Sequence, residues 1–344
     1  MLGREPTVRT KLGTVALFFG AFLVALAALS RFYAYERLAV VPYNSTATTI
    51  SETKPGADAE YLDIKQLEVV TGPLKSTRVT TGDVKRSKAV SNQLGRDVAI
   101  WDTYSCTDKP DFDCGADQTP LSGTIDLVAF DRTSGLAVEW EGSTSVSGGE
   151  TTKPEGFEGQ YFKFPFDTQK RSYEFWDGTI NRATTAEFVG EGEVDGLAVY
   201  KFRQTIEPTK SGTIDVPGDL VGENANTVTA DRMYANVRSF SVEPTTGVIL
   251  IGGEQQDSYL AVDGERKLTT TKVTLGYTDE TTQNLVDDYQ SKAFLLGLVK
   301  STIPLVGLVL GVLLIGLGLL SRRGRPPRRS DRHHEQTPVG AGAA

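Results

Sequence analysis

The chain has 344 residues and a formal net charge of −8, with 39% hydrophobic and 23% charged residues. This acidity argues against a nucleic-acid-binding protein, because phosphate binding requires a basic surface. The only histidines, His333 and His334, lie near the C-terminus, so the rest of the chain offers no imidazole. That absence excludes the common Ser-His-Asp and Cys-His hydrolases and most zinc enzymes.

Two apolar segments, residues 12–30 and 301–321, contain no charged residue. Each is long enough for a membrane-spanning helix, which needs about 20 residues. Basic residues lie between each segment and the nearer end of the chain, including Arg4, Arg9 and Lys11 before the first segment. Because lysine and arginine are retained on the cytoplasmic side, both termini are predicted to be cytoplasmic. A cleaved signal peptide is the alternative for the first segment, although its apolar core exceeds the roughly 7–15 residues typical of signal peptides.

The sequence between the spans is expected outside the plasma membrane, and residues 31–321 hold 27 basic and 41 acidic residues. From Asp279, acids in the first turn and apolar residues at helical spacing predict a helix that leads to the second span. The predicted organisation is a cytoplasmic N-terminus (1–11), a first transmembrane helix (12–35), an extracytoplasmic β-rich domain (36–278), a juxtamembrane helix (279–300), a second transmembrane helix (301–321) and a basic, disordered cytoplasmic tail (322–344).

Glycines in the second span predict close helix packing. Gly307 and Gly311 are four residues apart, which places them on one helix face where a second backbone can approach. The partner is either the first span or a second copy of the chain, so a homo-oligomer in the lipid bilayer is one expectation. The alternative is that these glycines reflect only the high glycine content of membrane helices.

Short alternating apolar runs, separated by Gly, Pro, Asn and Asp, predict an antiparallel sandwich or open barrel. The predicted strands cover residues 98–106, 124–131, 135–142, 172–177, 197–207, 236–243, 248–255 and 268–277. Two turns, residues 130–136 and 242–248, share a pattern in which an acid opens the turn and a glycine closes it. Both are typical of hairpins in which the glycine adopts a positive φ.

The two cysteines, Cys106 and Cys114, lie in a polar segment and predict a small disulfide-closed loop in an exported domain. A free redox pair is the alternative. Four acids of the same loop would suit calcium, although the spacing lacks the EF-hand pattern, and a solvated acidic hairpin is the other interpretation. These acids are Asp108, Asp111, Asp113 and Asp117.

Evidence for catalysis is weak. Glu139 and Glu141 flank Trp140 and would share one face of a strand. Glycosidases use two carboxylates, although usually from separate strands. Same-face surface acids are ordinary in an acidic domain, so the chain is predicted not to be an enzyme, without catalytic residues, cofactor or metal.

Aromatic residues are densest in residues 159–177, where they alternate with bases. One interpretation is a groove for an amphiphile with an anionic head, and the other is core packing around a proline turn. The candidate groove residues are Tyr161, Phe162, Phe164, Phe166, Lys170, Arg171 and Trp176.

Four motifs carry a family resemblance: GQYFKFPFDTQKRSYEFWD, AFDRTSG, SFSVEPTTGVI and the early RFYAYERLAVVP. Together with the terminal spans they resemble the actinobacterial porin PorA-like family over nearly the whole chain. The resemblance implies a cell-envelope membrane protein and transfers no catalytic residue.

The sequence therefore predicts a non-enzymatic, two-span protein of the plasma membrane. Its expected role is to bind or transfer an envelope lipid or another apolar ligand. A scaffolding role through protein partners is the first alternative. The porin-like pore that the family name implies is the second, although neither span has an ionisable residue to line a pore.

Overall fold

The computed structural model describes residues 8–115, 119–147, 150–152 and 156–322. The chain forms two compact units, which are described separately. One contains the described residues up to Ala34 together with those from Val299 onwards, and the other is Tyr35–Leu298. The predicted tail lies beyond the described residues from position 323 onwards, as do His333 and His334.

The first unit is a pair of apolar helices. It contains α1 (Val8–Leu29), the π-helical turn η1 (Ser30–Ala34), most of a second π-helical turn, η3 (Leu298–Thr302), and α5 (Ile303–Arg322). Both long helices are apolar enough to cross a membrane. Glycines allow their backbones to approach closely, since a Cβ built on Gly311 would lie 2.8 Å from the carbonyl oxygen of Gly20. Gly307 likewise packs against Ala27, so both glycines singled out in the sequence face α1 of the same chain.

The second unit is built around one antiparallel sheet. Its helical elements are α2 (Tyr35–Leu38), α3 (Val84–Leu94), the short 3₁₀ helix η2 (Gly218–Val221) and α4 (Asp279–Gly297). Its strands are β1 (Thr46–Thr53), β2 (Ala59–Asp63), β3 (Glu68–Gly72), β4 (Lys75–Gly82), β5 (Val98–Asp108), β6 (Ser122–Asp131), β7 (Thr144–Ser147), β8 (Glu150–Thr152), β9 (Tyr173–Asp177), β10 (Arg182–Val194), β11 (Leu197–Pro217), β12 (Thr227–Val242), β13 (Ile249–Val262) and β14 (Glu265–Tyr277).

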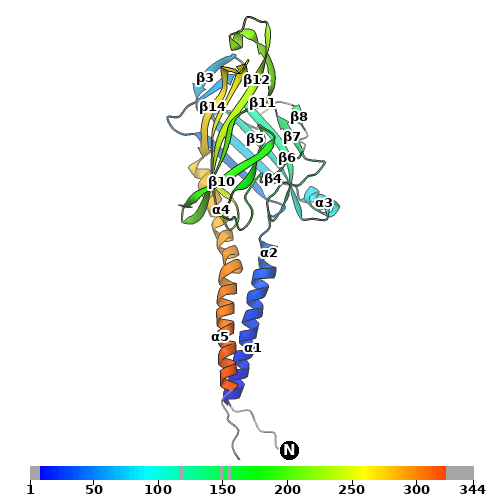
Figure 1. Ribbon diagram of the computed structural model, residues 1–344, viewed down its shortest axis with the longest axis vertical. Coiled ribbons are helices and arrows are strands. Elements are labelled where there is room, and N and C mark those ends of the chain that lie inside the picture. Colours follow the sequence, from blue (N-terminus) through cyan, green and yellow to red (C-terminus); the bar gives the residue numbers. More distant parts are fainter. Residues whose placement is uncertain (1–7, 116–118, 148–149, 153–155, 323–344) are drawn as a thin grey trace, which may run out of the picture. The chain divides into compact units, whose positions relative to one another are not determined.

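The strand order is β8-β7-β6-β5-β4-β1-β14-β13-β12-β11-β10-β9, with β2 paired to β14 and β3 paired to β2. The long strands β11 to β14 form a continuous meander, because each pairs with the next strand in the chain. In Figure 1 they lie in front of β4, β5 and β6, so the sheet folds over on itself as a half-barrel.

A connecting segment, residues 157–168, joins the two ends of this sheet; we call it the strap. Gln160 bridges antiparallel to Leu136, just after β6, and parallel to Phe175 in β9. The strap also bonds to both acid-opened turns: Phe164 N–H donates to the carbonyl of Gly247 at 2.9 Å, and Phe166 N–H to that of Thr133 at 3.4 Å. The half-barrel is therefore closed on one side by backbone hydrogen bonds to the strap.

The predicted fold class, a mainly β domain with an apolar helix near each terminus, is confirmed. Both predicted turns form with the expected chemistry. Asp131 accepts hydrogen bonds from the Thr133 and Ser134 amides, and Gly135 has φ = 73°. Glu243 does the same for the Thr245 and Thr246 amides, and Gly247 has φ = 74°.

The strand predicted at residues 135–142 is wrong. Leu136 and Ala137 form only isolated bridges, and the chain then turns through a hydrogen bond from Ser143 N–H to the Trp140 carbonyl. Leu136 pairs with the strap while Ala137 pairs with Phe130, so no single partner strand continues the ladder. Glu139 and Glu141 are exposed on this irregular segment, and they do not share the face of a strand.

Candidate functional site

One face of the sheet is unusually polar, and we call it the inner face. The cross-strand register places its residues of β1, β4, β5, β6 and β7 in three adjacent rows. These rows are Ser51–Ser76–Thr107–Ser122, Thr49–Arg78–Ser105–Thr124–Ser147 and Ala47–Thr80–Thr103–Asp126–Ser145. Every position carries a hydroxyl except Ala47, Arg78 and Asp126. Strand alternation explains this, because the Ser and Thr residues recur at every second position.

The same face continues across the meander through residues paired in register. Tyr277 lies opposite Ser51, Glu254 opposite Leu275, and Arg238 opposite Glu254. The inner face therefore brings together two arginines, Arg78 and Arg238, from distant parts of the chain. Their environments differ, and that difference determines what each can do.

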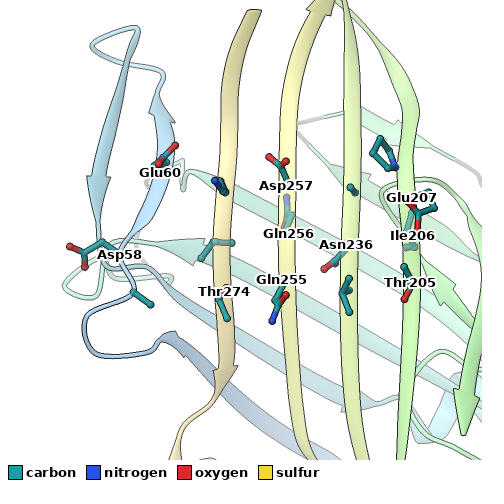
Figure 2. A pocket seen from close by; sticks show the side chains of 16 residues that line it. Asp58, Glu60, Thr205, Ile206, Glu207, Asn236, Gln255, Gln256, Asp257 and Thr274 are labelled. Atoms are coloured by element: carbon teal, nitrogen blue, oxygen red, sulfur yellow. The ribbon is translucent and has the colours of Figure 1, made fainter. Parts of the chain in front are cut away.

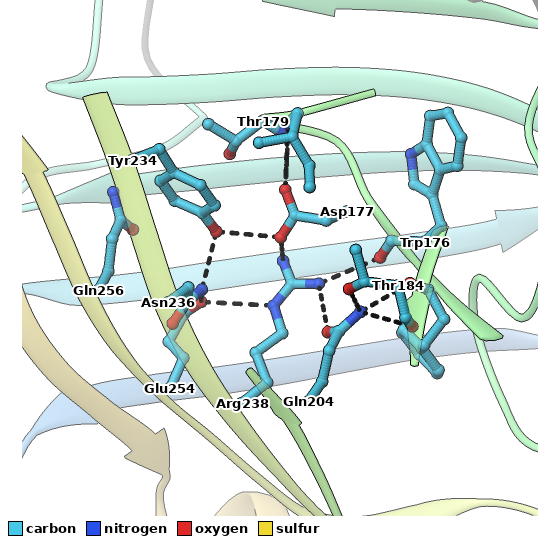
Figure 3. Close-up of polar contacts among 12 residues, drawn as sticks. Trp176, Asp177, Thr179, Thr184, Gln204, Tyr234, Asn236, Arg238, Glu254 and Gln256 are labelled. Atoms are coloured by element: carbon cyan, nitrogen blue, oxygen red, sulfur yellow. Dashed lines mark hydrogen bonds and ion pairs between the residues drawn. The ribbon is translucent and has the colours of Figure 1, made fainter. Parts of the chain in front are cut away.

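Arg238 is the centre of a closed polar network, shown in Figure 3. Its guanidinium lies 3.1 Å from Asp177 and 3.8 Å from Glu254, and it donates to the Trp176 carbonyl at 3.1 Å. Tyr234 donates its hydroxyl to Asp177 at 3.0 Å, and burial raises the pKa of that phenol well above its usual value. Asp177 is fully buried, so Arg238 supplies the counter-charge that this carboxylate requires.

A second cluster of polar side chains links the strap to β6. Tyr161 donates its hydroxyl to Asp126, and Ser145 donates to the other carboxylate oxygen. Burial raises the pKa of Tyr161, so its phenol stays a protonated donor. The Tyr161 ring also covers Arg78, whose guanidinium carbon lies 5.3 Å from the ring centroid. Both oxygens of Asp126 are thus occupied by neutral donors.

These groups suit recognition of polar solutes better than catalysis. Hydroxyls and fixed charges offer donors and acceptors to a hydrated ligand, whereas packed acyl chains require an apolar lining. Within the described ranges, no group of three or more His, Cys, Asp or Glu residues is arranged to hold a metal ion.

The predicted aromatic groove residues lie in packed clusters. Phe164 is fully buried and stacks on Phe202 with ring centroids 4.5 Å apart, and the rings of Tyr161 and Phe162 are 4.4 Å apart. Trp176 is buried against Phe157, while Phe166 packs beside Phe130. Lys170 is paired with Glu191 at 2.6 Å, and Arg171 covers Tyr173. This arrangement matches the core-packing interpretation and gives no support to lipid binding at these residues.

Cys106 and Cys114 form a disulfide with their Cα atoms 6.0 Å apart. Two acids of this loop accept local backbone hydrogen bonds: Asp108 from the Leu121 amide at 2.7 Å and Asp113 from the Gly115 amide at 2.8 Å. Asp117 lies outside the described residues. The loop is thus an acidic, disulfide-closed connection between β5 and β6.

A hollow of about 580 Å³ crosses β11 to β14 (Figure 2). Its lining mixes carboxylates, amides and one lysine, including Asp58, Glu60, Gln255, Asp257 and Lys272. Exposed side chains such as Thr205 and Glu207 flank it, so it opens on the opposite face from the Arg238 network. It contains none of the predicted groove residues.

Sequence reasoning overlooked the inner face. The alternation of Ser76, Arg78 and Thr80 in β4 is visible in the sequence, as is that of Thr103, Ser105 and Thr107 in β5. Polar alternation alone indicates only a solvated strand face. The register that stacks these rows beside one another was the missing information.

Comparisons with known proteins identify the family of this chain. The sequence profile of the family described as Porin PorA matches residues 12–320. The chain belongs to this porin family. A protein named Porin PorA from Corynebacterium amycolatum is 28% identical over 315 aligned positions, which cover 74% of this chain and 79% of that protein.

A second Porin PorA, from Corynebacterium resistens, is 26% identical over 286 aligned positions, covering 62% of this chain and 69% of that protein. The family resemblance seen in the sequence motifs is therefore confirmed. Family membership and the two apolar helices together identify a membrane protein.

Proposed function

We propose that this porin-family protein provides a path for hydrophilic solutes along the inner face of its β domain. The observation that carries the proposal is the three-row array of hydroxyls with Arg78 and Asp126. Porin interiors are polar because they are in contact with water and hydrated solutes. The relatives named Porin PorA support the same function.

In this proposal the two apolar helices anchor the protein in the plasma membrane, with both termini cytoplasmic and the β domain outside. Neither residues 12–30 nor residues 301–321 include an ionisable side chain. Polar lining in membrane proteins marks the solute path, so the inner face of the β domain forms the hydrophilic part of the path, and the helix pairs of several copies surround the part that crosses the bilayer. The protein needs no catalytic residue for this role.

The test is solute flux through the full-length protein reconstituted in liposomes. We expect uptake of a neutral sugar above that of empty liposomes. Ser76→Trp places a large ring on the inner face and should reduce uptake at least severalfold. Thr77→Trp is the matched control, because the next residue of β4 points to the opposite face and should leave uptake unchanged.

Two results would contradict the proposal. One is uptake no greater than that of empty liposomes when the protein is inserted and folded. The other is an equal loss of uptake in Ser76→Trp and Thr77→Trp, which would show that the inner face has no special role. Equal melting temperatures of the two variants in detergent would establish that both are folded.

A further inference from the structure

Arg78 has four nearest neighbours on the inner face, and all carry a hydroxyl. Ser76 and Thr80 precede and follow it on the same face of β4, while Thr49 and Ser105 lie beside it on β1 and β5. No carboxylate occupies an adjacent position. The guanidinium therefore lies at the centre of a patch of hydroxyl donors.

The guanidinium is held in place on one side. Its Nε donates to Thr103 Oγ1 at 3.2 Å, and that oxygen lies 3.1 Å from Thr80 Oγ1. The rings of Tyr161 and Phe162 cover it at 5.3 and 5.8 Å. A cation over aromatic faces loses little orientational freedom when it binds a ligand.

The other side of Arg78 is unused. Among the described residues, no carboxylate forms an ion pair with it, and its two terminal nitrogens make no hydrogen bond to protein. Arg238 on the same face has two carboxylates and a carbonyl. Asp126, the acid nearest in register, accepts hydrogen bonds from Tyr161 and Ser145 instead. Arg78 is thus half-buried, fixed in orientation and without a counter-ion.

We propose that Arg78 and the surrounding hydroxyls form a binding subsite for an oxyanion, the carboxylate or phosphate group of a small hydrophilic solute. The two terminal nitrogens form a planar fork that pairs with two oxygens of such a group. Ser and Thr hydroxyls supply further donors to the same oxygens. The subsite's part in solute passage rests on the proposed function, whereas the binding itself does not.

The test is calorimetric titration of the full-length protein in detergent with inorganic phosphate and, separately, with acetate at constant ionic strength. We expect saturable binding of at least one of them. Arg78→Gln should weaken it by about tenfold or more, because a charge-assisted bidentate pair is lost. Arg78→Lys keeps the charge but not the fork, and it should give a smaller loss.

The matched control is Arg203→Gln. Arg203 is exposed on the opposite face of β11, so its removal tests for a non-specific effect of charge. Ser105→Ala removes one neighbouring hydroxyl without changing charge, and it should weaken binding severalfold in a folded protein. The preferred probe then identifies the source: tighter phosphate binding indicates a phosphorylated solute, and tighter acetate binding a carboxylate.

Absence of saturable binding by the folded wild-type protein would overturn the proposal. So would an equal loss in Arg78→Gln and Arg203→Gln, or unchanged binding in Arg78→Gln. Failure of the proposed solute path is distinguishable from failure of the binding subsite. Binding that depends on Arg78 without sugar flux would reject the solute path and keep the subsite, and flux without such binding would do the reverse.

Discussion

Lys163 is the most unfavourably placed charged residue of the strap. Its ammonium nitrogen is buried without a hydrogen-bond partner and lies 3.9 Å from the centroid of the Phe166 ring. Burial lowers the pKa of Lys163 to about 7, and the nearby Glu243 carboxylate only partly opposes this effect. The strap therefore keeps a lysine whose charged form is destabilised by the fold.

Lys163→Met should stabilise the protein at neutral pH by roughly 2–5 kcal/mol, because each unit of pKa depression corresponds to about 1.4 kcal/mol. The sign of the pH dependence follows from the pKa. The unfolded amine titrates near 10.5 and the folded one near 7, so between these values the unfolded chain binds more protons. Wild-type stability should rise with pH across that window and be insensitive to this group below it.

The measurement is the melting temperature of the full-length protein in detergent as a function of pH. Lys163→Met should lack the rise above neutral pH. Lys85→Met, at an exposed position of α3, is the control and should follow the wild type. A wild-type curve that is flat from neutral to alkaline pH would show that the amine is hydrated.

At the residue scale, local patterns predicted local chemistry. The spacing of Cys106 and Cys114 in a domain expected to be exported predicted the disulfide, with a free redox pair as the alternative, and the acid–glycine spacing predicted both turns. The aromatic segment left two interpretations open, because a run of rings looks the same in a groove and in a core. Deciding between them requires the partners that long-range pairing supplies, such as Phe202 for Phe164.

The two acid-opened turns hold the strap. In one of them the glycine has a positive φ and also lies against the strap, whereas the glycine of the β13–β14 hairpin has only the positive φ. Gly247 combines φ = 74° with a close approach, since an added Cβ would lie 2.1 Å from the Phe164 carbonyl oxygen. Gly264 has φ = 81° at the β13–β14 hairpin with nothing within 4 Å. A comparison of substitutions at Gly247 and Gly264 therefore distinguishes backbone strain, which occurs at both positions, from steric conflict with the strap, which occurs only at Gly247.

Gly247→Ala should therefore cost more than Gly264→Ala. The positive φ alone is worth about 1 kcal/mol at either position, and at Gly247 the strap must also move. We expect a clearly lower melting temperature for Gly247→Ala and faster amide hydrogen exchange in residues 157–168. Equal melting temperatures would mean that the strap adjusts without loss.

The helix pair of the first unit permits a similar comparison. A Cβ on Gly311 would lie 2.7 Å from a methyl carbon of Val24, whereas Gly316 on the same helix has nothing within 4 Å. Gly311→Leu should separate α1 from α5, because close backbone approach replaces hydrophobic driving force inside lipid. Gly316→Leu is the control and should be neutral.

Cysteine cross-linking between the two helices reports the separation directly. Efficient cross-linking in the wild type and in Gly316→Leu, with loss in Gly311→Leu, is the expected pattern. If Gly311→Leu cross-links within one chain as well as the wild type does, the glycine contact does not hold the helices together.

At the scale of elements, alternation predicted part of each strand of the meander, although β11, β12 and β13 extend well beyond the predicted segments. Weakly apolar strands were missed. β1 and β4 are rich in Thr and Ser, so nothing in their composition marks a buried strand. α3 was also missed, although Asp83 caps its N-terminus and Gly95 ends it at φ = 64°. The strand predicted at residues 135–142 was wrong for the opposite reason: the alternation is present, but the partner strand is not.

The charge distribution of the whole molecule determines its expected topology. Arginines and lysine flank the apolar helices on the terminal sides, whereas the segment between them is acidic and carries the disulfide. Both features favour the same orientation, because bases stay in the cytoplasm and disulfides form in oxidising compartments. We therefore expect two transmembrane spans with the β domain outside.

Reporter fusions in cells test this orientation. A fluorescent protein fused after Ala344 should fluoresce, and alkaline phosphatase inserted at the β13–β14 turn, at Gly264, should be active only if that turn is exported. The native cysteines supply an independent readout, since Cys106 and Cys114 should resist a thiol reagent until they are reduced. Cysteines that react with a membrane-permeant reagent without prior reduction but not with an impermeant one, or an inactive phosphatase with a stable fusion, would place the β domain in the cytoplasm. A solute path in contact with the outside would then be ruled out, because its polar inner face would lie in the wrong compartment.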